Sequence, residues 1–492
     1  MRYIAAVDQG TSSTRAMLYA LDGTLVRSHQ VPLTQYYPKA GEVEHCPEEI
    51  IRTTLECLKR VLDGTAPGEA VACGLTNQRE TTLLWDRQTG KALSRAIVWQ
   101  DRRTHAFCES LSKASDGIQR KTGLLPDAYF SASKLRWLLD EIPDARQRAE
   151  KGQLAFGTVD SWLLWHLTGG KVHATDITNA SRTLLFNIID RTWDEDLLAL
   201  FDIPASVLPE VKDSDAHYGV TDSSVLGHRV PLIGVAGDQQ AALIGQRCFE
   251  PGMCKATFGT GGFLLMNTGT KPVYSGHRLL TTVAYAIQGK VAYGLEGSLY
   301  HAGTTVKWLR DALQLITTSS ETETLAESLT DNGGVYLVPA FTGLGAPYWT
   351  SAPGAAIFGL TRESNRAHFA RAALESVCYQ TREVLACMRD DAGFLPSTLR
   401  VDGGMAANGW FLQYLASQCG VVVQKPHDIE TTALGAAFLA GLGASVIPSP
   451  KALMTQSMTE KEWMPLEGRA QIDRDFSGWQ RAVKAVGVFA PR

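Results

Sequence analysis

The fold is decided by residues 3–26, YIAAVDQGTSSTRAMLYALDGTLV, which predict a β-meander. The apolar run Tyr3–Val7 predicts a strand, and Arg15–Leu21 predicts the strand that returns beside it. Asp22-Gly23, between two β-rich runs, is the strongest short-range signal of a hairpin. The polar turn at residues 10–14 then lies at the strand ends, where its backbone amides and hydroxyls can approach a ligand.

A similar strand–turn–strand unit, ATFGTGGFLLMN at residues 256–267, follows just past the midpoint of the chain. Elsewhere helical and strand patterns alternate, with helices predicted at Glu48–Leu62 and Ser133–Asp140 and a strand at Val71–Leu75. Such alternation is typical of α/β layered domains. Two halves that each carry a Gly- and Thr-rich turn predict duplicated α/β domains that face one cleft.

The chain is long enough for two domains, because single cores stop growing at roughly 250–300 residues and this chain has 492. Pro251-Gly252 interrupts the pattern between the two halves. We therefore expect the boundary near Gln246–Pro251. The predicted N-terminal domain spans residues 1–248 and the C-terminal domain residues 249–492.

Composition excludes several classes of protein. Lys and Arg number 47 against 51 Asp and Glu, a net charge of −4, which favours neither nucleic acid nor an anionic membrane as a partner. The nine cysteines form no Cys-x-x-Cys pair and no zinc spacing, as expected of reduced thiols in the cytoplasm. The run Ala433–Ile447 is too short for an integral membrane segment and predicts a close-packed internal helix. We expect a soluble, cytoplasmic protein.

Three glycine-rich segments stand at predicted strand ends: DQGTSSTR (8–15), FGTGG (258–262) and VDGG (401–404). Each alone is typical of an ordinary turn, but together, over both halves, they indicate a nucleotide held between domains. Asp8 is suited to hold Mg²⁺, directly or through water. The chain lacks the P-loop motif, the dinucleotide-binding glycine motif and the protein-kinase motifs, so those nucleotide-binding classes are excluded.

Two polar segments directly follow predicted strands. In LIGVAGDQQ (232–240), Asp238 stands where a buried strand meets a helix, as an N-cap or as a general base that accepts a proton from a hydroxyl. In TNQRETT (76–82), Arg79 and Glu80 form a solvated pair or bind adjacent hydroxyls. Aromatic residues near these segments are, taken singly, more typical of core: Trp99, Tyr129 and Phe263.

Eight motifs, in one order from about Tyr3 to about Val483, together resemble the FGGY carbohydrate kinases, and within them the members that phosphorylate glycerol. The motifs are DQGTSSTR (8–15), NQRETT (77–82), IVWQDRR (97–103), YFSASKLRW (129–137), GDQQ (237–240), FGTG (258–261), FTGLGAPYW (341–349) and VDGG (401–404). The family is part of the actin/hexokinase/heat-shock ATPase superfamily. The resemblance implies an α/β fold of two ribonuclease-H-like domains with a nucleotide and substrate cleft between them.

The resemblance also implies a role for each matching residue. Those expected at the transferring phosphates are Thr11, Ser12, Ser13 and Arg15, with Asp8 near Mg²⁺. Those expected to line the nucleotide site are Thr260, Gly303, Lys307, Gly404 and Asn408, with Lys307 standing where the family often has Gln. Those expected to hold the glycerol hydroxyls are Arg79, Glu80, Tyr129, Asp238 and Gln239, with Trp99 and Phe263 against its carbon edge. Asp238 is expected to be the general base.

The implied activity is ATP-dependent phosphorylation of glycerol to sn-glycerol 3-phosphate, with ATP and Mg²⁺, in a homodimer or homotetramer. Hinge-wise closure on the substrates would suppress transfer to water. Two alternatives stay open: a kinase for another sugar or polyol such as a pentulose, and a non-catalytic actin-like nucleotide switch. NQRETT together with GDQQ favours glycerol over a pentulose, and Asp238 beside a polyol pocket argues against the switch.

Overall fold

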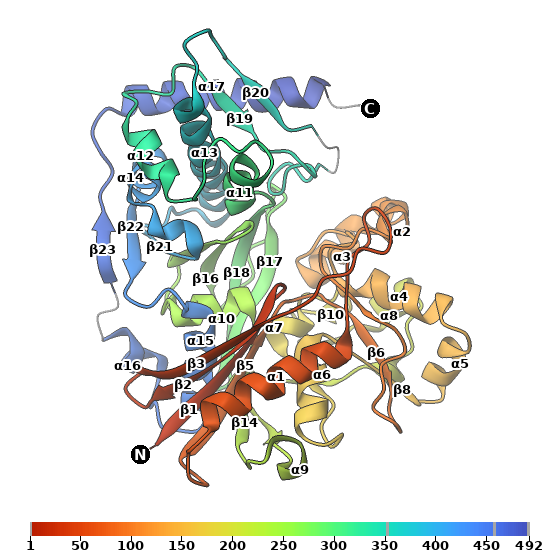
Figure 1. The fold of residues 1–492 in the computed structure, drawn as a ribbon. Helices are drawn as coiled ribbons and strands as arrows, with labels where there is room; N and C mark the ends of the chain where they lie inside the picture. The colour runs from red at the N-terminus through yellow and green to blue at the C-terminus, as the bar shows by residue number, and fades with distance from the viewer. Residues whose placement is uncertain (1, 351–353, 456–458, 490–492) are drawn as a thin grey trace.

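The computed structural model describes residues 2–350, 354–455 and 459–489, and two large β-sheets organise it (Figure 1). The six-stranded sheet has the order β13-β14-β5-β1-β2-β3. Its strands are β1 (Tyr3–Gln9), β2 (Ser13–Ala20), β3 (Leu25–Pro32), β5 (Ala70–Asn77), β13 (His217–Val220) and β14 (Pro231–Gly237). Strands β1, β2 and β3 form the predicted antiparallel meander, whereas β5 and β14 run parallel to β1.

The seven-stranded sheet has the order β17-β18-β16-β15-β21-β22-β23. Its strands are β15 (Cys254–Phe258), β16 (Gly262–Gly269), β17 (Leu280–Ile287), β18 (Lys290–Leu299), β21 (Thr398–Asp402), β22 (Val422–Pro426) and β23 (Thr459–Trp463). The hairpin β15–β16 corresponds to β1–β2, and the parallel strands β21 and β22 correspond to β5 and β14. The prediction of two halves built on one plan is confirmed.

Helices cover both faces of the six-stranded sheet. Helix α1 (Pro47–Leu62) packs on β1, β2 and β3, and it begins with Pro47 and two acidic residues, which favour a helix N-terminus. Helices α10 (Asp238–Gly245) and α15 (Thr431–Gly443) lie between the two sheets (Figure 1). Although α15 belongs to the second half of the chain, it packs on β1, β5 and β14 of the first.

The other elements form two outer regions. Beside the first sheet lie α2 (His105–Ser110), α3 (Ser115–Thr122), α4 (Ser131–Glu141), α5 (Ala145–Glu150), α6 (Val159–Leu167), α7 (Ile177–Ala180), α8 (Glu195–Phe201) and α9 (Ser223–Leu226), with the short strands β4 (Glu44–His45), β6 (Leu83–Asp86), β7 (Ala96–Ile97), β8 (Leu154–Gly157), β9 (Ala174–Asp176), β10 (Phe186–Asn187), β11 (Thr192–Trp193) and β12 (Glu210–Lys212). In the second half lie α11 (Gly303–Asp311), α12 (Glu321–Glu327), α13 (Arg366–Ala392), α14 (Gly409–Cys419), α16 (Pro450–Met454), α17 (Arg469–Phe489), β19 (Tyr336–Val338) and β20 (Ala356–Phe358).

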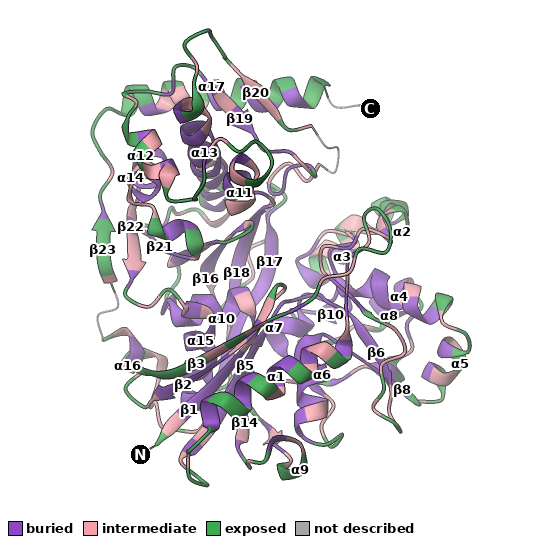
Figure 2. Ribbon diagram, viewed as in Figure 1, coloured by how far each residue is buried: buried purple, intermediate pink, exposed green. Residues whose placement is uncertain are grey.

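One hydrophobic cluster joins the two halves of the molecule. It contains Ile4 of β1, Ala72 of β5, Leu243 of α10, Leu265 of β16 and Leu439 of α15, all buried. Figure 2 shows the same continuity, with α10, α15 and the adjoining strands buried and β3 and β23 exposed at the sheet edges. Among the described residues, no helix is both long and apolar enough to cross a membrane.

Candidate functional site

The first glycine-rich turn connects β1 to β2 and presents its hydroxyls at the end of the sheet. The Gly10 amide donates to the Ser13 carbonyl at 2.9 Å, which closes the turn, and Ser12 is exposed. The indole Nε1 of Trp99 donates to the Thr11 hydroxyl at 2.9 Å. Thr11, predicted to contact the phosphates, and Trp99, predicted to lie against the substrate, are therefore in direct contact.

Asp8 and Arg15 are register partners across β1 and β2. Arg15 forms an ion pair with Glu430, at the N-terminus of α15, so a predicted phosphate ligand is linked to the second half of the chain. Burial, with repulsion from nearby Asp238, raises the pKa of Asp8 to about 7. A cation bound at Asp8 would relieve this repulsion.

Asp238 is the first residue of α10, directly after β14. The N-cap position belongs to Gly237, so the side chain of Asp238 does not fill it. One carboxylate oxygen of Asp238 lies 3.2 Å from Nε of Arg79. The same oxygen accepts a hydrogen bond from the backbone N–H of Gln239 at 2.7 Å. The side chain keeps 29% exposure, and burial raises its pKa against the opposing charges of Arg79 and Lys255. An accessible carboxylate beside a fixed guanidinium is suited to accept a proton.

Arg79 and Glu80 are both buried, but each finds its closest charged partner elsewhere. Nη2 of Arg79 donates to Glu296 of β18 at 3.1 Å, whereas Glu80 accepts from Nε of Arg182 at 2.6 Å. Arg79 and Glu80 approach each other only to 3.9 Å. Arg182 also donates to Glu296 at 2.9 Å. The site therefore contains a four-membered charge cluster rather than an isolated pair.

The backbone of Glu80 is strained. Its φ is +58°, a left-handed conformation that residues other than glycine seldom adopt and that costs on the order of 1–3 kcal/mol. The Glu80 carbonyl accepts hydrogen bonds from the hydroxyls of Ser131 at 3.1 Å and Thr82 at 3.0 Å, which stabilise this conformation. Its side chain is thereby aimed at Arg182, inside the cluster.

Three charged residues of the site were missed from the sequence: Arg182, Lys255 and Glu296. Lys255 lies within β15 and Glu296 within β18, each flanked by buried residues, and all three charged side chains are fully buried at 0% exposure. A charged residue inside an otherwise buried strand is a usable signal, because such residues are almost never fully buried unless paired. The partners of Arg182 and Glu296 lie more than 100 positions away along the sequence, too far to be identified from it.

The predicted aromatic residues meet around one ring. Trp99 packs edge-on against Tyr129 with ring centroids 5.7 Å apart, and against Phe263 of β16 at 6.1 Å. Taken singly these residues are typical of core, yet Trp99 and Phe263 are only half-buried. Because Trp99 also bonds Thr11, its ring connects the first glycine-rich turn with the second.

The second and third glycine-rich segments form one surface. The amide of Gly303, the first residue of α11, donates to the Gly259 carbonyl at 2.9 Å, and Thr304 donates to that of Thr260 at 3.1 Å. A Cβ at Gly403 would lie 2.6 Å from the Phe258 carbonyl, and φ there is +86°, so glycine is required. The FGTG and VDGG turns consequently pack directly on each other.

The remaining predicted nucleotide residues surround these turns. Gly404 begins a short 3₁₀ segment, and a Cβ at this position would meet open space. Asn408 caps α14, because its side-chain oxygen accepts a hydrogen bond from the backbone N–H of Phe411 at 2.8 Å. Asn408 also donates to Thr322 at 3.2 Å. Lys307 is exposed one turn into α11. The structure thus gathers the predicted residues of the second half near the ends of β15, β21 and α11.

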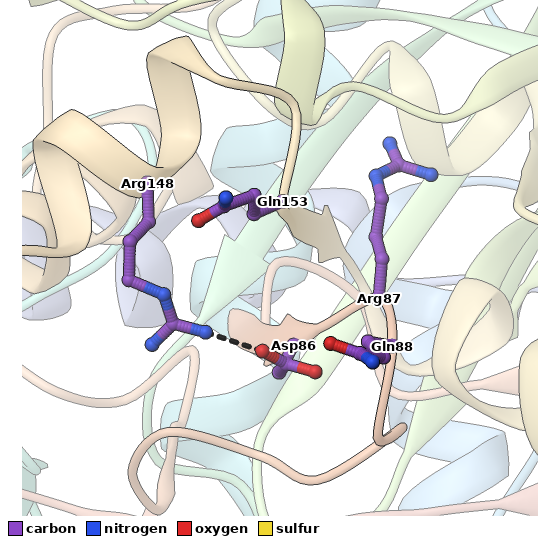
Figure 3. A pocket seen from close by; sticks show the side chains of 5 residues that line it. All are labelled: Asp86, Arg87, Gln88, Arg148 and Gln153. Atoms are coloured by element: carbon purple, nitrogen blue, oxygen red, sulfur yellow. Dashed lines mark hydrogen bonds and ion pairs between the residues drawn. The ribbon is translucent and has the colours of Figure 1, made fainter.

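Two surface depressions lie outside this group of residues. Figure 3 shows one of about 500 Å³, lined by Asp86, Arg87, Gln88, Arg148 and Gln153. Arg148 is paired with Asp86, and Arg87 donates to the carbonyls of Leu154 and Ser206, so these cations are already occupied. The other depression surrounds α5. Neither contains a predicted site residue.

Family models match most of the chain: the N-terminal domain of the FGGY family of carbohydrate kinases matches residues 3–245, and its C-terminal domain matches residues 254–444. The chain belongs to the FGGY family of carbohydrate kinases. The family's two-domain, actin-like architecture agrees with the duplicated sheets described above. The resemblance seen in the sequence is confirmed.

Individual members of the FGGY family resemble the chain over its full length. The glycerol kinases of Coxiella burnetii (strain Dugway 5J108-111) and Alcanivorax borkumensis are 52% and 53% identical to it, over 98% and 99% of this chain and 97% and 98% of theirs. A crystal structure of Plasmodium falciparum glycerol kinase with ADP matches with a TM-score of 0.91 at 36% identity, covering 99% of this chain and 98% of that one.

Proposed function

We propose that this FGGY kinase transfers the γ-phosphate of ATP to glycerol and forms sn-glycerol 3-phosphate. The observation that carries the proposal is the carboxylate of Asp238, which is partly accessible, lies 3.2 Å from Nε of the buried Arg79 and contributes to raising the pKa of Asp8 on β1. The high identity to glycerol kinases over the whole chain supports glycerol over a pentulose and catalysis over a passive nucleotide switch.

The reaction is a single in-line displacement. The terminal hydroxyl oxygen of glycerol forms a bond to the γ-phosphorus, the bond to the β–γ bridging oxygen breaks, and ADP leaves. The hydroxyl proton passes to Asp238. Phosphoryl transfer needs orientation of the nucleophile more than strong basicity, so a carboxylate fixed by Arg79 at 3.2 Å is sufficient.

The remaining side chains supply binding and orientation. Glu80 and Asp238 accept hydrogen bonds from substrate hydroxyls, whereas Arg79 donates, and Trp99 and Phe263 cover the carbon edge. The backbone amides and hydroxyls of residues 11–13 hold the transferring phosphate. On the opposite side Thr260, Gly303, Lys307, Gly404 and Asn408 hold the nucleotide.

Mg²⁺ fits the donor set at Asp8. Magnesium retains several waters and takes one or two carboxylates plus substrate phosphates. Asp8, at the end of β1 beside the turn that would hold the phosphates, supplies one such carboxylate. When bound, the ion neutralises charge on the phosphates during transfer.

The test is coupled ADP release with glycerol, dihydroxyacetone, D-xylulose and L-ribulose as acceptors. We expect glycerol to give the highest kcat/KM. A pentulose preference would overturn the assignment of substrate, and nucleotide binding without acceptor-dependent ADP release would identify a switch. Because buried donors and acceptors lose their partners when a hydroxyl is missing, we expect 1,2- and 1,3-propanediol to be strongly rejected.

A further inference from the structure

Lys255 is a fully buried cation directly behind the proposed substrate site. It lies on β15, and its Nζ donates to three oxygens: Oε1 of Gln239, the Thr257 hydroxyl at 3.0 Å and the Phe263 carbonyl at 3.3 Å. An ammonium group has three N–H donors, so these three acceptors satisfy it completely. None of the three carries a formal charge.

Burial lowers the pKa of Lys255, and charged side chains around it oppose that effect only in part. Asp402, Asp238 and Glu296 attract the ammonium group, whereas Arg79 repels it. A buried ammonium group costs folding free energy unless nearby groups compensate its charge. The presence of a lysine at this position therefore needs an explanation other than packing. The contact with Gln239 supplies one, because Gln239 directly follows Asp238 at the start of α10.

The chemistry of the contact fixes the orientation of the Gln239 amide. The two ends of a glutamine amide are nearly alike in shape, but one accepts hydrogen bonds and the other donates them. Lysine can only donate, so Oε1 must face Nζ, and the opposite orientation would set donor against donor. The Nε2 group of Gln239 is then left for the substrate.

We propose that Lys255 is a positioning residue that holds Gln239 so that its Nε2 donates to a hydroxyl oxygen of the substrate. This inference rests on the proposed function and adds a specificity rule to it. The polyol site then presents two acceptors, Asp238 and Glu80, and two donors, Arg79 and Gln239. The Nε2 group of Gln239 therefore favours a substrate with an oxygen that can accept a hydrogen bond. It disfavours a substrate with an ammonium group at the same place.

The test is a double-mutant cycle on the glycerol KM. Replacing Lys255 by Met keeps an unbranched side chain and removes all three donors. We expect K255M to raise the glycerol KM about three- to tenfold, the change that corresponds to the loss of one typical hydrogen bond. The effect on the ATP KM should be smaller. In the Q239A background the same substitution is expected to change the glycerol KM less than about twofold, because the residue through which Lys255 acts is gone.

Two further variants keep the test decisive, even where K255M folds poorly. Q239E keeps the contact with Lys255 as an ion pair but leaves no donor for the substrate, so we expect it to raise the glycerol KM as much as Q239A. The control T257V removes a different acceptor of Lys255 and is expected to leave the glycerol KM within about twofold. Glycerol binding by Q239E equal to wild type, or an undiminished effect of K255M in the Q239A background, would overturn the proposal.

The wild-type acceptor assay separates this proposal from the assignment of glycerol. If glycerol supports no ADP release, the proposed substrate is wrong, and the same cycle is measured with the best acceptor found. The coupling between Lys255 and Gln239 is then still expected. Its absence with an active acceptor would contradict the role of Lys255 alone.

Discussion

The charged side chains of the site are held mainly by one another. Glu296 accepts from both Arg79 and Arg182, and all three are nearly or fully buried. Removing one member of such a cluster leaves an uncompensated buried charge. Glu296→Gln is therefore expected to lower the free energy of unfolding by about 3–5 kcal/mol, measured by urea denaturation.

The matched control is Glu210→Gln. Glu210 pairs with Lys212 at 3.4 Å but is 68% exposed, so solvent screens the pair. We expect its substitution to change stability by less than about 0.5 kcal/mol. Equal changes in the free energy of unfolding for the two substitutions would show that the buried cluster contributes no more to stability than an exposed ion pair.

Asp8 gives a pH-dependent prediction. Its folded-state pKa of about 7 lies above the ordinary value of 3.8, so the native protein disfavours the ionised form. The corresponding stability is complete below about pH 4 and is lost as the pH rises through 7. Without nucleotide or Mg²⁺, Asp8→Asn should thus have a higher free energy of unfolding than wild type at pH 8, by roughly 4 kcal/mol, measured by denaturation at each pH. The difference should vanish near pH 4; a constant difference would refute the shift.

Among the site residues, the sequence predicts only those that belong to recognisable motifs. Arg79 and Asp238 follow predicted strands in polar segments, and Trp99 stands in the IVWQDRR motif. In the structure Arg79 lies 3.2 Å from Asp238, and Trp99 packs against Tyr129 and Phe263. Glu296 has no such context and is 217 positions from its partner Arg79. Contacts of that separation depend on how the two halves dock, which residue patterns do not specify.

Among the elements, α10 and α15 make the closest contact between the two halves. A Cβ at Gly435 would lie 1.8 Å from the Ala241 carbonyl, so the backbones of the two helices touch. Gly435→Ala is expected to destabilise the protein by about 1–3 kcal/mol through overpacking, measured by thermal denaturation. A stable Gly435→Ala protein would show that the helices can move apart at little cost.

Gly487 in α17 provides the control for that substitution. It has no atom within 4 Å of an added Cβ, so Gly487→Ala meets open space. Alanine favours a helix interior over glycine by roughly 0.5–1 kcal/mol. We expect Gly487→Ala to be neutral or slightly stabilising, opposite in sign to Gly435→Ala.

The sequence predicts these elements well but not their packing partners. The Ala- and Gly-rich run at residues 433–447 predicts a close-packed internal helix, and α15 occupies most of it. Hydrophobic periodicity is a local property, however, and does not indicate which sheet a helix covers. That α15 returns to β1, β5 and β14 follows only from the tertiary structure.

For the whole molecule, the shared core makes each half depend on the other. Without residues 249–492, the fragment 1–248 would expose the face of the first sheet that α15 covers, including Ile4 and Ala72. We expect this fragment to aggregate when expressed alone and to become soluble when co-expressed with residues 249–492. A monomeric, cooperatively unfolding fragment 1–248 would show instead that the first half is independent.

The measurement that tests the mechanism most directly is kcat of Asp238→Asn, taken beside its thermal midpoint and ATP affinity. The substitution preserves shape, and Gly237 rather than Asp238 occupies the N-cap, so folding and ATP binding should persist. Only the proton acceptor and its charge are lost. We predict a fall in kcat on the order of 10²–10⁴-fold with an unchanged thermal midpoint. A kcat close to wild type would remove Asp238 from the reaction and contradict the mechanism.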